Sequence, residues 1–267
     1  MEKGRTRVEQ LSAMLAQWIR MDLPEICQVF GVSESTARRM CRAAEAAGIA
    51  VRTYGGVLQY ISRPETENEY FFERKAAEHI EEKKLIGAYA CSQVNSGDII
   101  FVSGGTTAEL FIRCMAARIE RGELSRVVVM TNSIRAAEIL GDLTDVLLTG
   151  GTYRPYRRDV AGYASEATIR GARFNKSFLG VDGVVLSDGL MALDNDTANM
   201  DRLVTSRSDS VFILADSSKF HTKSFISYEH FLPKHIIVSD DGLNAENRQQ
   251  AEEQGITMVL CAKEDVE

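Results

Sequence analysis

The chain has 267 residues, a length that suits two domains better than one ordinary domain. Hydrophobic residues make up 45% and charged residues 26%, with 4 Pro and 20 Gly, so the composition is globular and excludes disordered and fibrous classes. The net charge of −7 argues at first against nucleic acid as a partner, because binding to phosphates needs clustered Lys and Arg.

The charge is unevenly distributed along the chain. Residues 1–63 hold nine Lys and Arg against six acids, a net charge of +3. The remainder holds 22 bases against 32 acids, a net charge of −10. This asymmetry predicts a small basic module joined to a larger acidic one.

The N-terminus and the cysteines favour a cytoplasmic protein. Residues 1–5 lead into an amphipathic stretch, and no window approaches eighteen uninterrupted apolar residues, so we expect no membrane segment. The five cysteines lack the close spacing of a zinc or redox motif, which favours reduced, mostly buried thiols over a thiol sensor. They are Cys27, Cys41, Cys91, Cys114 and Cys261.

Three helices are predicted near the N-terminus. Apolar residues recur at three- and four-residue spacing over residues 5–20, which indicates an amphipathic helix. A short helix over residues 23–30 ends at Gly31, and Ser33 caps a third helix that ends at Gly48. The third helix has one apolar face, formed by Ala37, Met40, Cys41, Ala44 and Ala47.

The second and third helices, joined by a tight turn, are typical of a helix-turn-helix that enters the DNA major groove. Arg reads guanine bidentately and hydroxyls hold phosphates. Two β-prone runs about Gly55-Gly56 predict a wing. The alternative is a small helical domain whose arginines form only a solvated face. The residues expected to contact DNA are Ser33, Ser35, Thr36, Arg38, Arg39, Arg42, Arg52 and Tyr54.

Residues 30–39 (Phe-Gly-Val-Ser-Glu-Ser-Thr-Ala-Arg-Arg), Gly48-Ile49 and residues 52–56 (Arg-Thr-Tyr-Gly-Gly) resemble the N-terminal domain of the DeoR family of bacterial transcriptional regulators. That family usually shows a VS-x-x-T-x-RRDL core and an R-x-H/Y-GG wing. This chain has Met40-Cys41 in place of Asp-Leu, while the Arg pair and the wing are intact. The resemblance implies a winged helix-turn-helix domain over residues 1–61.

Residues 62–72 mix Pro with polar and acidic residues and predict a linker. A charged helix over residues 73–94 follows, and apolar β-branched runs then alternate with helical periods. The alternation predicts an α/β domain over residues 73–267 with a mostly parallel sheet covered on both faces. Strands are predicted near residues 99–102, 127–130, 146–148, 177–180, 211–215, 236–239 and 257–260, and helices near 108–121, 134–140, 197–206 and 245–254.

Small, donor-rich loops follow four of these strands. Glycine lets backbone amides approach an anion, and ligands in parallel sheets gather beyond the carboxyl ends of strands. Although Gly, Ser and Thr are ordinary turn residues, four such loops favour a phosphorylated, polyhydroxylated ligand. Lys219 is expected to be its cationic partner, and Asp216 or Asp182 to accept from sugar hydroxyls. The expected effector-binding residues are Ser103, Gly104, Gly105, Thr106, Thr107, Thr131, Asn132, Ser133, Gly150, Gly151, Thr152, Arg154, Asp182, Gly183, Asp216 and Lys219.

These loops also resemble a known domain. Residues 103–107 (Ser-Gly-Gly-Thr-Thr), 180–183 (Gly-Val-Asp-Gly) and 214–220 (Leu-Ala-Asp-Ser-Ser-Lys-Phe) are similar to the DeoR-type sensor domain, which implies a Rossmann-like fold similar to sugar-phosphate isomerases. Two positions depart from the family pattern. Val102-Ser-Gly-Gly-Thr stands where the family often has Asp-Ser-Gly-Thr-Thr, and Thr197-Ala-Asn-Met-Asp201 stands where it often has Glu-Ala-x-x-Lys.

Other patterns give weaker signals. Residues 194–198 begin like a calcium loop but lack its Gly and third ligand, so no metal is expected, and no cofactor is expected either. His79, His221, His230 and His235 lack ligand spacing, which favours surface histidines. The basic, aromatic residues 153–158 either close over a phosphate or form a mobile surface loop.

Two functions are open at this point. The first is a transcription factor, which we expect to be a repressor of a carbohydrate-utilisation operon. Its binding to double-stranded operator DNA is expected to respond to a phosphorylated sugar or sugar-derivative effector, and it is expected to form a homodimer or homotetramer. The second is a sugar-phosphate isomerase or deaminase with an accessory domain, for which Asp182 is the candidate general base. The Arg-bearing third helix favours the regulator, because an enzyme has no use for it.

Overall fold

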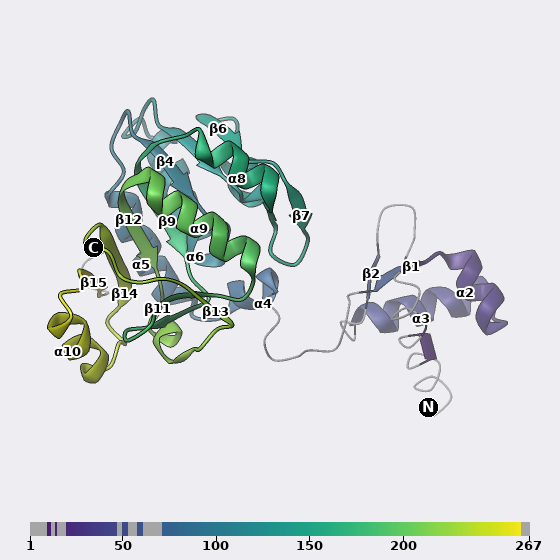
Figure 1. The fold of residues 1–267 in the computed structure, drawn as a ribbon. Helices are drawn as coiled ribbons and strands as arrows, with labels where there is room; N and C mark the ends of the chain where they lie inside the picture. The colour runs from purple at the N-terminus through teal and green to yellow at the C-terminus, as the bar shows by residue number, and fades with distance from the viewer. Residues whose placement is uncertain are drawn as a thin grey trace. The chain divides into compact units, whose positions relative to one another are not determined.

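The computed structural model describes residues 10–11, 14, 20–46, 50–52, 58–60 and 71–262. The chain divides into two units, Met1–Glu69 and Tyr70–Glu267. The division falls inside the predicted linker, residues 62–72, while the predicted domain limits 1–61 and 73–267 stay predictions. Figure 1 shows both units as ribbons.

Two helices and a small antiparallel sheet make up the described part of the N-terminal unit (Figure 1). Helix α2 (Leu23–Phe30) begins with a capping box in which Asp22 and Glu25 each accept the other's backbone N–H. It ends at Gly31, whose φ of 57° is the left-handed conformation that glycine adopts without strain. Helix α3 (Glu34–Ala46) follows. The sheet has the order β1 (Arg20–Met21), β3 (Leu58–Tyr60), β2 (Ala50–Arg52).

The first predicted helix, residues 5–20, extends too far. Leu11 and Met14 are helical as expected, but Arg20 and Met21 form β1 and pair with β3. Pairing satisfies the backbone of this segment and buries the Met21 side chain, so sheet formation prevails over helix continuation. Strands β2 and β3 occupy the predicted wing, and its turn, residues 53–57, lies outside the described residues.

A seven-stranded parallel sheet forms the centre of the C-terminal unit (Figure 1). All seven predicted strands are confirmed. The chain starts in the middle at β4, adds β5 and β6 on one side, and then adds β9, β12, β14 and β15 on the other. The strands are β4 (Ile99–Val102), β5 (Val128–Thr131), β6 (Asp145–Leu148), β9 (Phe174–Gly180), β12 (Ser208–Leu214), β14 (His235–Asp240) and β15 (Met258–Cys261).

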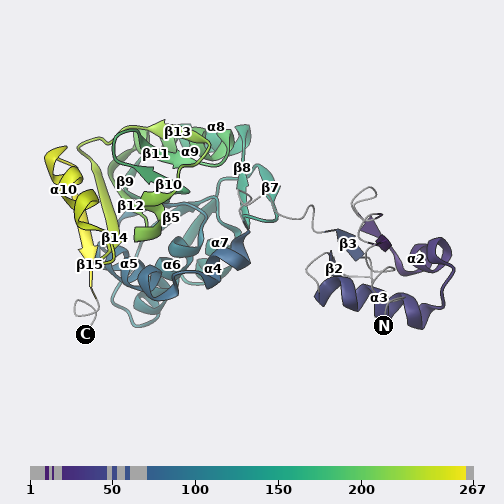
Figure 2. The same cartoon turned by 90° about the horizontal axis from the view of Figure 1, so that it is seen from below.

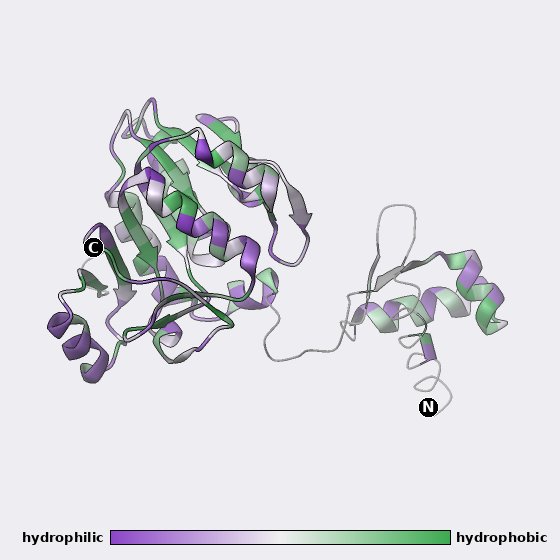
Figure 3. Cartoon of the chain, in the orientation of Figure 1, coloured by the Kyte–Doolittle hydropathy of each residue, from purple (hydrophilic) through white to green (hydrophobic). Residues whose placement is uncertain are grey.

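Helices cover both faces of this sheet, as Figure 2 shows from below. Along β4, Ile100 and Val102 pack into one apolar cluster and Phe101 into the other, which is the two-residue alternation of a strand buried on both sides. The first cluster includes α5 (Ile80–Ser92), α6 (Thr106–Glu120) and α7 (Ile134–Leu140), and the second includes α8 (Tyr163–Arg170), α9 (Asn195–Arg207) and α10 (Ala245–Glu253). Apolar strands therefore lie between helices whose outer faces are hydrophilic (Figure 3).

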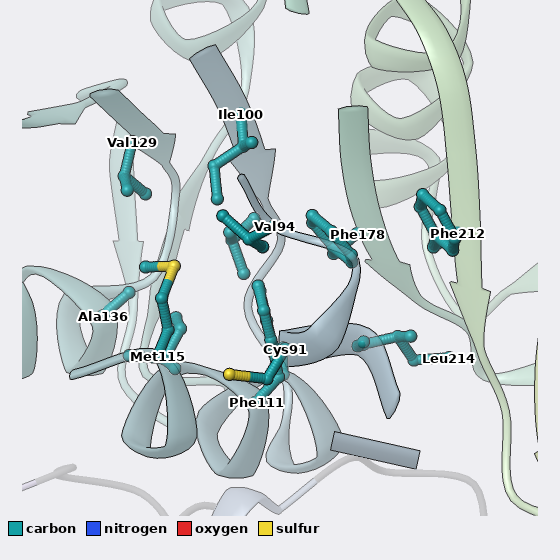
Figure 4. Close-up of a cluster of buried hydrophobic side chains, with 14 of the residues drawn as sticks. Cys91, Val94, Ile100, Phe111, Met115, Val129, Ala136, Phe178, Phe212 and Leu214 are labelled. Atoms are coloured by element: carbon teal, nitrogen blue, oxygen red, sulfur yellow. The ribbon is translucent and has the colours of Figure 1, made fainter. Parts of the chain in front are cut away.

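Stacked aromatic rings join neighbouring strands in the first cluster (Figure 4). The Phe178 ring on β9 stacks on Phe212 of β12, with 5.0 Å between centroids and 13° between planes. Phe111 of α6 lies against the same Phe178 ring, with 4.4 Å between centroids. These contacts fix α6 on the sheet next to the carboxyl ends of β4 and β9.

The predicted helix over residues 73–94 is two helices. Helix α4 (Phe72–Ala77) ends at Glu78, and His79 has a φ of 52° before α5 begins at Ile80. Lys83 holds this break, because its buried ammonium group donates to the carbonyl oxygens of Lys75 at 2.5 Å and Glu78 at 2.6 Å. The bonds are tertiary, which is why helical periodicity alone predicts one continuous helix.

Several short elements were not predicted. A hairpin joins β7 (Thr152–Arg154) to β8 (Asp159–Ala161), and α8 follows it. A small antiparallel sheet has the order β10 (Gly183–Val185), β11 (Gly189–Ala192), β13 (Ile226–Glu229), and a 3₁₀ turn, η1 (Ser217–His221), follows β12. These strands mix polar residues or glycine with apolar residues, and so lack the wholly apolar runs that mark the equally short strands β4 and β15.

The histidines and cysteines differ in part from expectation. His235 is 1% exposed, so the expectation of a surface position was wrong for it, whereas His79 and His230 are exposed. None of the five cysteines, all of them described residues, forms a disulfide, and Cys41, Cys91 and Cys261 are buried as expected. Although far apart in sequence, Cys91 and Cys114 interact, and the interaction lowers the pKa of the Cys114 thiol to about 7.

Candidate functional site

A cavity opens where the order of strands reverses, at the carboxyl ends of β4, β9 and β12. Neighbouring strands β4 and β9 continue into opposite halves of the sheet, which is where open α/β sheets bind ligands. Ser103 follows β4, Val181 follows β9 and Leu214 ends β12, and all three residues line the cavity. The predicted residues that line it are Ser103, Gly104, Gly105, Thr106, Thr107, Asn132, Asp182 and Lys219.

The loop after β4 brings backbone amides and hydroxyls to one wall of the cavity. Gly105 has a φ of 141° and leads into α6, so Thr106 and Thr107 occupy the first turn of that helix. Gly104 donates its N–H to Asn132 Oδ1 at 2.8 Å, and Ser103 Oγ accepts the N–H of Gly180 at 2.9 Å. These bonds hold the loop between β5 and β9 and leave the helix N-terminus towards the cavity, where it favours an anion.

Three lysines line the cavity near that loop: Lys75, Lys83 and Lys219. Lys83 is 3% exposed, and burial lowers its pKa, with Asp216 opposing the effect. Only Lys219 was predicted. Lys83 lies on the face of α5 that buries Ile86 and Ala90. A basic residue on the apolar face of a helix was therefore the sequence pattern that could have predicted Lys83 as a site residue.

Carboxylates and two arginines form a second charged group at the cavity. Arg154 of β7 donates to Asp159 at 2.8 and 2.7 Å and to Asp194 at 2.9 Å. Arg157 lies more loosely, with its Nη2 atom 3.4 Å from both carboxylate oxygens of Asp182. Arg157, Asp159 and Asp182 line the cavity, whereas Arg154 does not.

Asp201 of α9 also lines the cavity. It is 2% exposed, and its Oδ1 atom has no hydrogen-bond partner within the part of the chain that the structure describes. Burial raises its pKa well above the usual range, and the nearby Asp182 raises it further. The comparison with the family pattern singled out this position without assigning it to the site.

Other predicted residues support the site without lining it. Thr131 Oγ1 donates to the carbonyl oxygen of Val102 at 2.7 Å, and Ser133 caps α7 by accepting the N–H of Ala136. Asp216 caps the turn η1 by accepting the N–H of Ser218, and its Oδ2 atom is buried without a partner among the described residues. These side chains shape loops beside the cavity.

The glycine loop after β6 lies against a neighbouring strand. A Cβ atom on Gly151 would stand 2.5 Å from the carbonyl oxygen of Ala161, so the backbone approaches β8 closely. Gly150, Gly151 and Thr152 do not line the cavity, and neither does Gly183, where a Cβ atom would stand 2.2 Å from the carbonyl oxygen of Thr222. Close packing of backbones is thus the structural reason for glycine at these two positions.

Residues 153–158 fold as a hairpin with contacts to two other parts of the unit. The N–H of Phe72 donates to the carbonyl oxygen of Tyr156 at 2.8 Å, and the Phe71 and Tyr156 rings meet with 5.1 Å between centroids. Arg157 reaches the cavity from this hairpin. The hairpin therefore links the start of α4 to the cavity wall.

Helix α3 presents a polar face in the N-terminal unit. Ala37, Met40, Cys41 and Ala44 are buried, as predicted, and Ala47 lies outside the described residues. Arg38 forms an ion pair with Glu34 at 2.5 Å, whereas Arg39 has no ion pair among the described residues. Ser33, Ser35, Arg38, Arg39 and Arg42 are exposed and Thr36 is half-buried, while the Arg52 side chain and Tyr54 lie outside what the structure describes.

Comparison with known proteins assigns both units. A family model described as "DeoR C terminal sensor domain" matches residues 78–241, and one described as "DeoR-like helix-turn-helix domain" matches residues 7–62. The chain belongs to the DeoR family of transcriptional regulators. The resemblance and the fold class predicted from the sequence are therefore confirmed.

The similarity to relatives covers nearly the whole of this DeoR-family chain. The chain is 27% identical over 258 residues to the HTH-type transcriptional regulator IolR of Bacillus subtilis, and the alignment covers 96% of this chain and 98% of IolR. It is 28% identical over 252 residues to the lactose phosphotransferase system repressor of Lactococcus lactis, covering 94% and 96%. A ribose 5-phosphate isomerase A from Methanocaldococcus jannaschii matches with a TM-score of 0.41 and 20% identity over 54% of this chain and 55% of that chain, too distant to carry an argument.

Within the described residues, no helix has the length and hydropathy that crossing a bilayer requires. Over the same residues, no group of three or more His, Cys, Asp or Glu side chains is arranged to hold a metal ion.

Proposed function

We propose that the protein is an effector-responsive repressor of a carbohydrate-utilisation operon. Its α3 helix and wing bind operator DNA in the cytoplasm, and a phosphorylated sugar or sugar derivative in the C-terminal cavity changes DNA affinity. The observation that carries the proposal is the meeting of the α6 N-terminus with Lys75, Lys83 and Lys219 at one cavity.

A phosphate group suits the wall formed by this loop and these lysines. The first turn of α6 offers backbone N–H groups that have no partner within the helix, and the helix dipole favours negative charge there. Thr106 and Thr107 add hydroxyl groups, and Lys219 adds a half-buried ammonium group. Asp182, also at the cavity, accepts hydrogen bonds from the hydroxyl groups of a sugar.

The exposed face of α3 suits insertion in the major groove. Arg39 is free of ion pairs among the described residues and so carries a guanidinium group available for a base or a phosphate. A basic module of net charge +3 gives one protomer limited affinity. We therefore expect a homodimer or homotetramer whose symmetry matches repeated half-sites.

Repression of carbohydrate genes is supported by what the relatives are named. The Lactococcus lactis relative is a lactose phosphotransferase system repressor, and another relative, from Escherichia coli O157:H7, is named a putative aga operon transcriptional repressor. An enzyme is disfavoured because Asp182, the candidate base, already accepts from the Leu193 N–H at 2.9 Å and lies beside Arg157.

A thermal-shift screen of the full chain tests the effector. Phosphorylated sugars and sugar alcohols are compared with the same sugars without phosphate and with inorganic phosphate. At a concentration of 100 times Kd, specific binding stabilises the folded state by about 2.7 kcal/mol, so a phosphorylated member of the set is expected to raise Tm clearly. If no phosphorylated compound raises Tm more than its parent sugar does, the proposal is wrong.

A further inference from the structure

The charges around the cavity fall into two groups of different character. Lys83 lies within electrostatic reach of two other lysines, Lys75 and Lys219, and of the carboxylates of Glu78 and Asp216. All three lysines line the cavity. Asp201 lies within reach of Asp182, Asp194, Arg154 and Arg157 instead. One part of the cavity is therefore rich in ammonium groups and the other in carboxyl groups.

The carboxyl-rich part contains more acids than bases. In the part of the chain that the structure describes, three carboxyl groups line it, those of Asp159, Asp182 and Asp201, against the single guanidinium group of Arg157. Arg154 does not line the cavity and is engaged by Asp159 and Asp194. Arg157 is shared at distances of 3.4 Å or more among Asp159, Asp182 and Asp194. Asp201 receives no ion pair from either arginine within the described residues, so this carboxyl group lacks a cation of its own.

Asp201 is an unpartnered polar group aimed into the cavity. It is only 2% exposed and lines the cavity. Its Oδ1 atom accepts no hydrogen bond from any described residue. An unsatisfied buried carboxyl group costs stability unless a partner arrives. The Tyr228 hydroxyl is buried within electrostatic reach of Asp201 and also has no hydrogen-bond partner among the described residues. It therefore does not satisfy the Asp201 carboxyl group.

We infer that the effector is zwitterionic, with a phosphate group beside the lysines and a protonated amine between Asp182 and Asp201. A protonated amine supplies three donors and no acceptor, which matches a wall of carboxyl oxygens, whereas a hydroxyl group supplies one donor. The positive charge also allows Asp201 to ionise in the complex, because an opposite charge offsets burial. The ligand class is an amino-sugar phosphate, and the inference rests on the proposed function of the cavity.

Matched pairs of ligands test the inference on the full chain by calorimetric titration at pH 7. Glucosamine 6-phosphate is compared with glucose 6-phosphate and galactosamine 6-phosphate with galactose 6-phosphate, and N-acetylglucosamine 6-phosphate provides the same skeleton without the charge. A hydrogen-bonded charge pair corresponds to about tenfold or more in affinity. We expect at least one amino ligand to bind about tenfold more tightly than its hydroxyl analogue and, for glucosamine 6-phosphate, also than its N-acetyl analogue.

The Asp201→Asn variant shows whether this residue is responsible. It keeps the side-chain shape and removes the carboxylate, so the preference for the amine over the neutral analogues should fall to within about twofold. Asp209→Asn is the matched control, because the Asp209 side chain is 68% exposed and lies outside the cavity. Asp209→Asn should keep the full preference.

The outcomes separate the two proposals. If sugar phosphates bind but each neutral member binds as tightly as its amine, or if the preference survives in Asp201→Asn, the inference is overturned and the proposed function stands. If no member of any pair binds while another phosphorylated sugar of the thermal-shift screen does, only the inference is overturned. If no phosphorylated sugar of the pairs or of the screen binds, the proposed function fails and the inference fails with it. The ligand pairs decide the question on the natural sequence even if Asp201→Asn does not fold.

Discussion

The Lys83 Nζ atom lies 2.6 Å from the carbonyl oxygen of Glu78, the residue at which α4 ends. The same ammonium group lines the cavity. A single buried cation thus contacts both the candidate effector site and the break between α4 and α5. A negatively charged ligand bound in the cavity would compete with the carbonyl oxygens of Lys75 and Glu78 for the ammonium group.

The Lys83→Met variant should be less stable and should bind the effector weakly. Methionine keeps most of the side-chain volume but leaves the carbonyl oxygens of Lys75 and Glu78 without their donor, which costs about 1–3 kcal/mol of unfolding free energy. Urea unfolding measures this loss. Lys84→Met is the matched control, because the Lys84 side chain is 56% exposed and pairs only at the surface with Glu81. Equal stability of the two variants would show that Lys83 does not hold the break.

His235 should make the C-terminal unit sensitive to acid. Burial lowers its pKa from 6.5 to about 4, and Lys234 contributes. Between pH 6.5 and pH 4 the imidazole is protonated in the unfolded chain but stays neutral in the folded one. The free energy of unfolding is therefore highest above pH 6.5 and decreases as the pH falls towards 4. His235 should therefore lower the free energy of unfolding in urea by about 2 kcal/mol between pH 7.5 and pH 4.5.

Replacing the imidazole isolates its share of that acid sensitivity. His235→Gln cannot take up a proton in this range and should remove about 2 kcal/mol of the difference between the two pH values. His230→Gln is the control, because His230 is exposed. An acid sensitivity that is unchanged in His235→Gln would mean that the buried imidazole titrates as an exposed one does.

The Arg39→Ala variant should lose operator affinity by about 10- to 100-fold, since one Arg contact to guanine is worth about 1–3 kcal/mol. Binding to DNA selected by the protein from a random pool measures this loss, and thermal shift should show unchanged effector binding. Arg173→Ala, whose side chain is 78% exposed in the C-terminal unit, serves as the control. A normal footprint by Arg39→Ala would place the recognition surface elsewhere.

The protein should not turn over aldose or ketose phosphates. Asp182 is held by the Leu193 N–H and by Arg157, an arrangement that suits a binding group better than a free base. Coupled assays with pentose and hexose phosphates should show no turnover above buffer. Turnover that disappears in Asp182→Asn would establish an enzyme instead.

Much of the fold could be predicted from the sequence because its signals are local. Apolar runs gave all seven strands of the parallel sheet, and Gly31 marked the end of α2. Helix α8 (Tyr163–Arg170) was missed. The break at His79 was missed because Lys83 stabilises it through space.

The cavity could be predicted only where its residues follow strands. Loop residues such as Ser103 and Lys219 were found because strand ends converge at one edge of the sheet. Lys83 and Asp201 were missed as site residues, since both lie within helices and reach the cavity only after folding. The Gly150-Gly151 loop has the composition of an anion-binding loop, yet Gly151 serves to let the backbone approach β8.

The most direct test of the central claim is the change in DNA affinity on saturation with effector. Fluorescence anisotropy of a labelled DNA fragment selected by the full chain is measured with and without the sugar phosphate that raises Tm most. Coupling between sites predicts a change in Kd for DNA of at least about fivefold, reduced in Lys219→Ala while its DNA affinity without effector stays the same. A Kd for DNA that is unchanged at saturating effector would contradict the account.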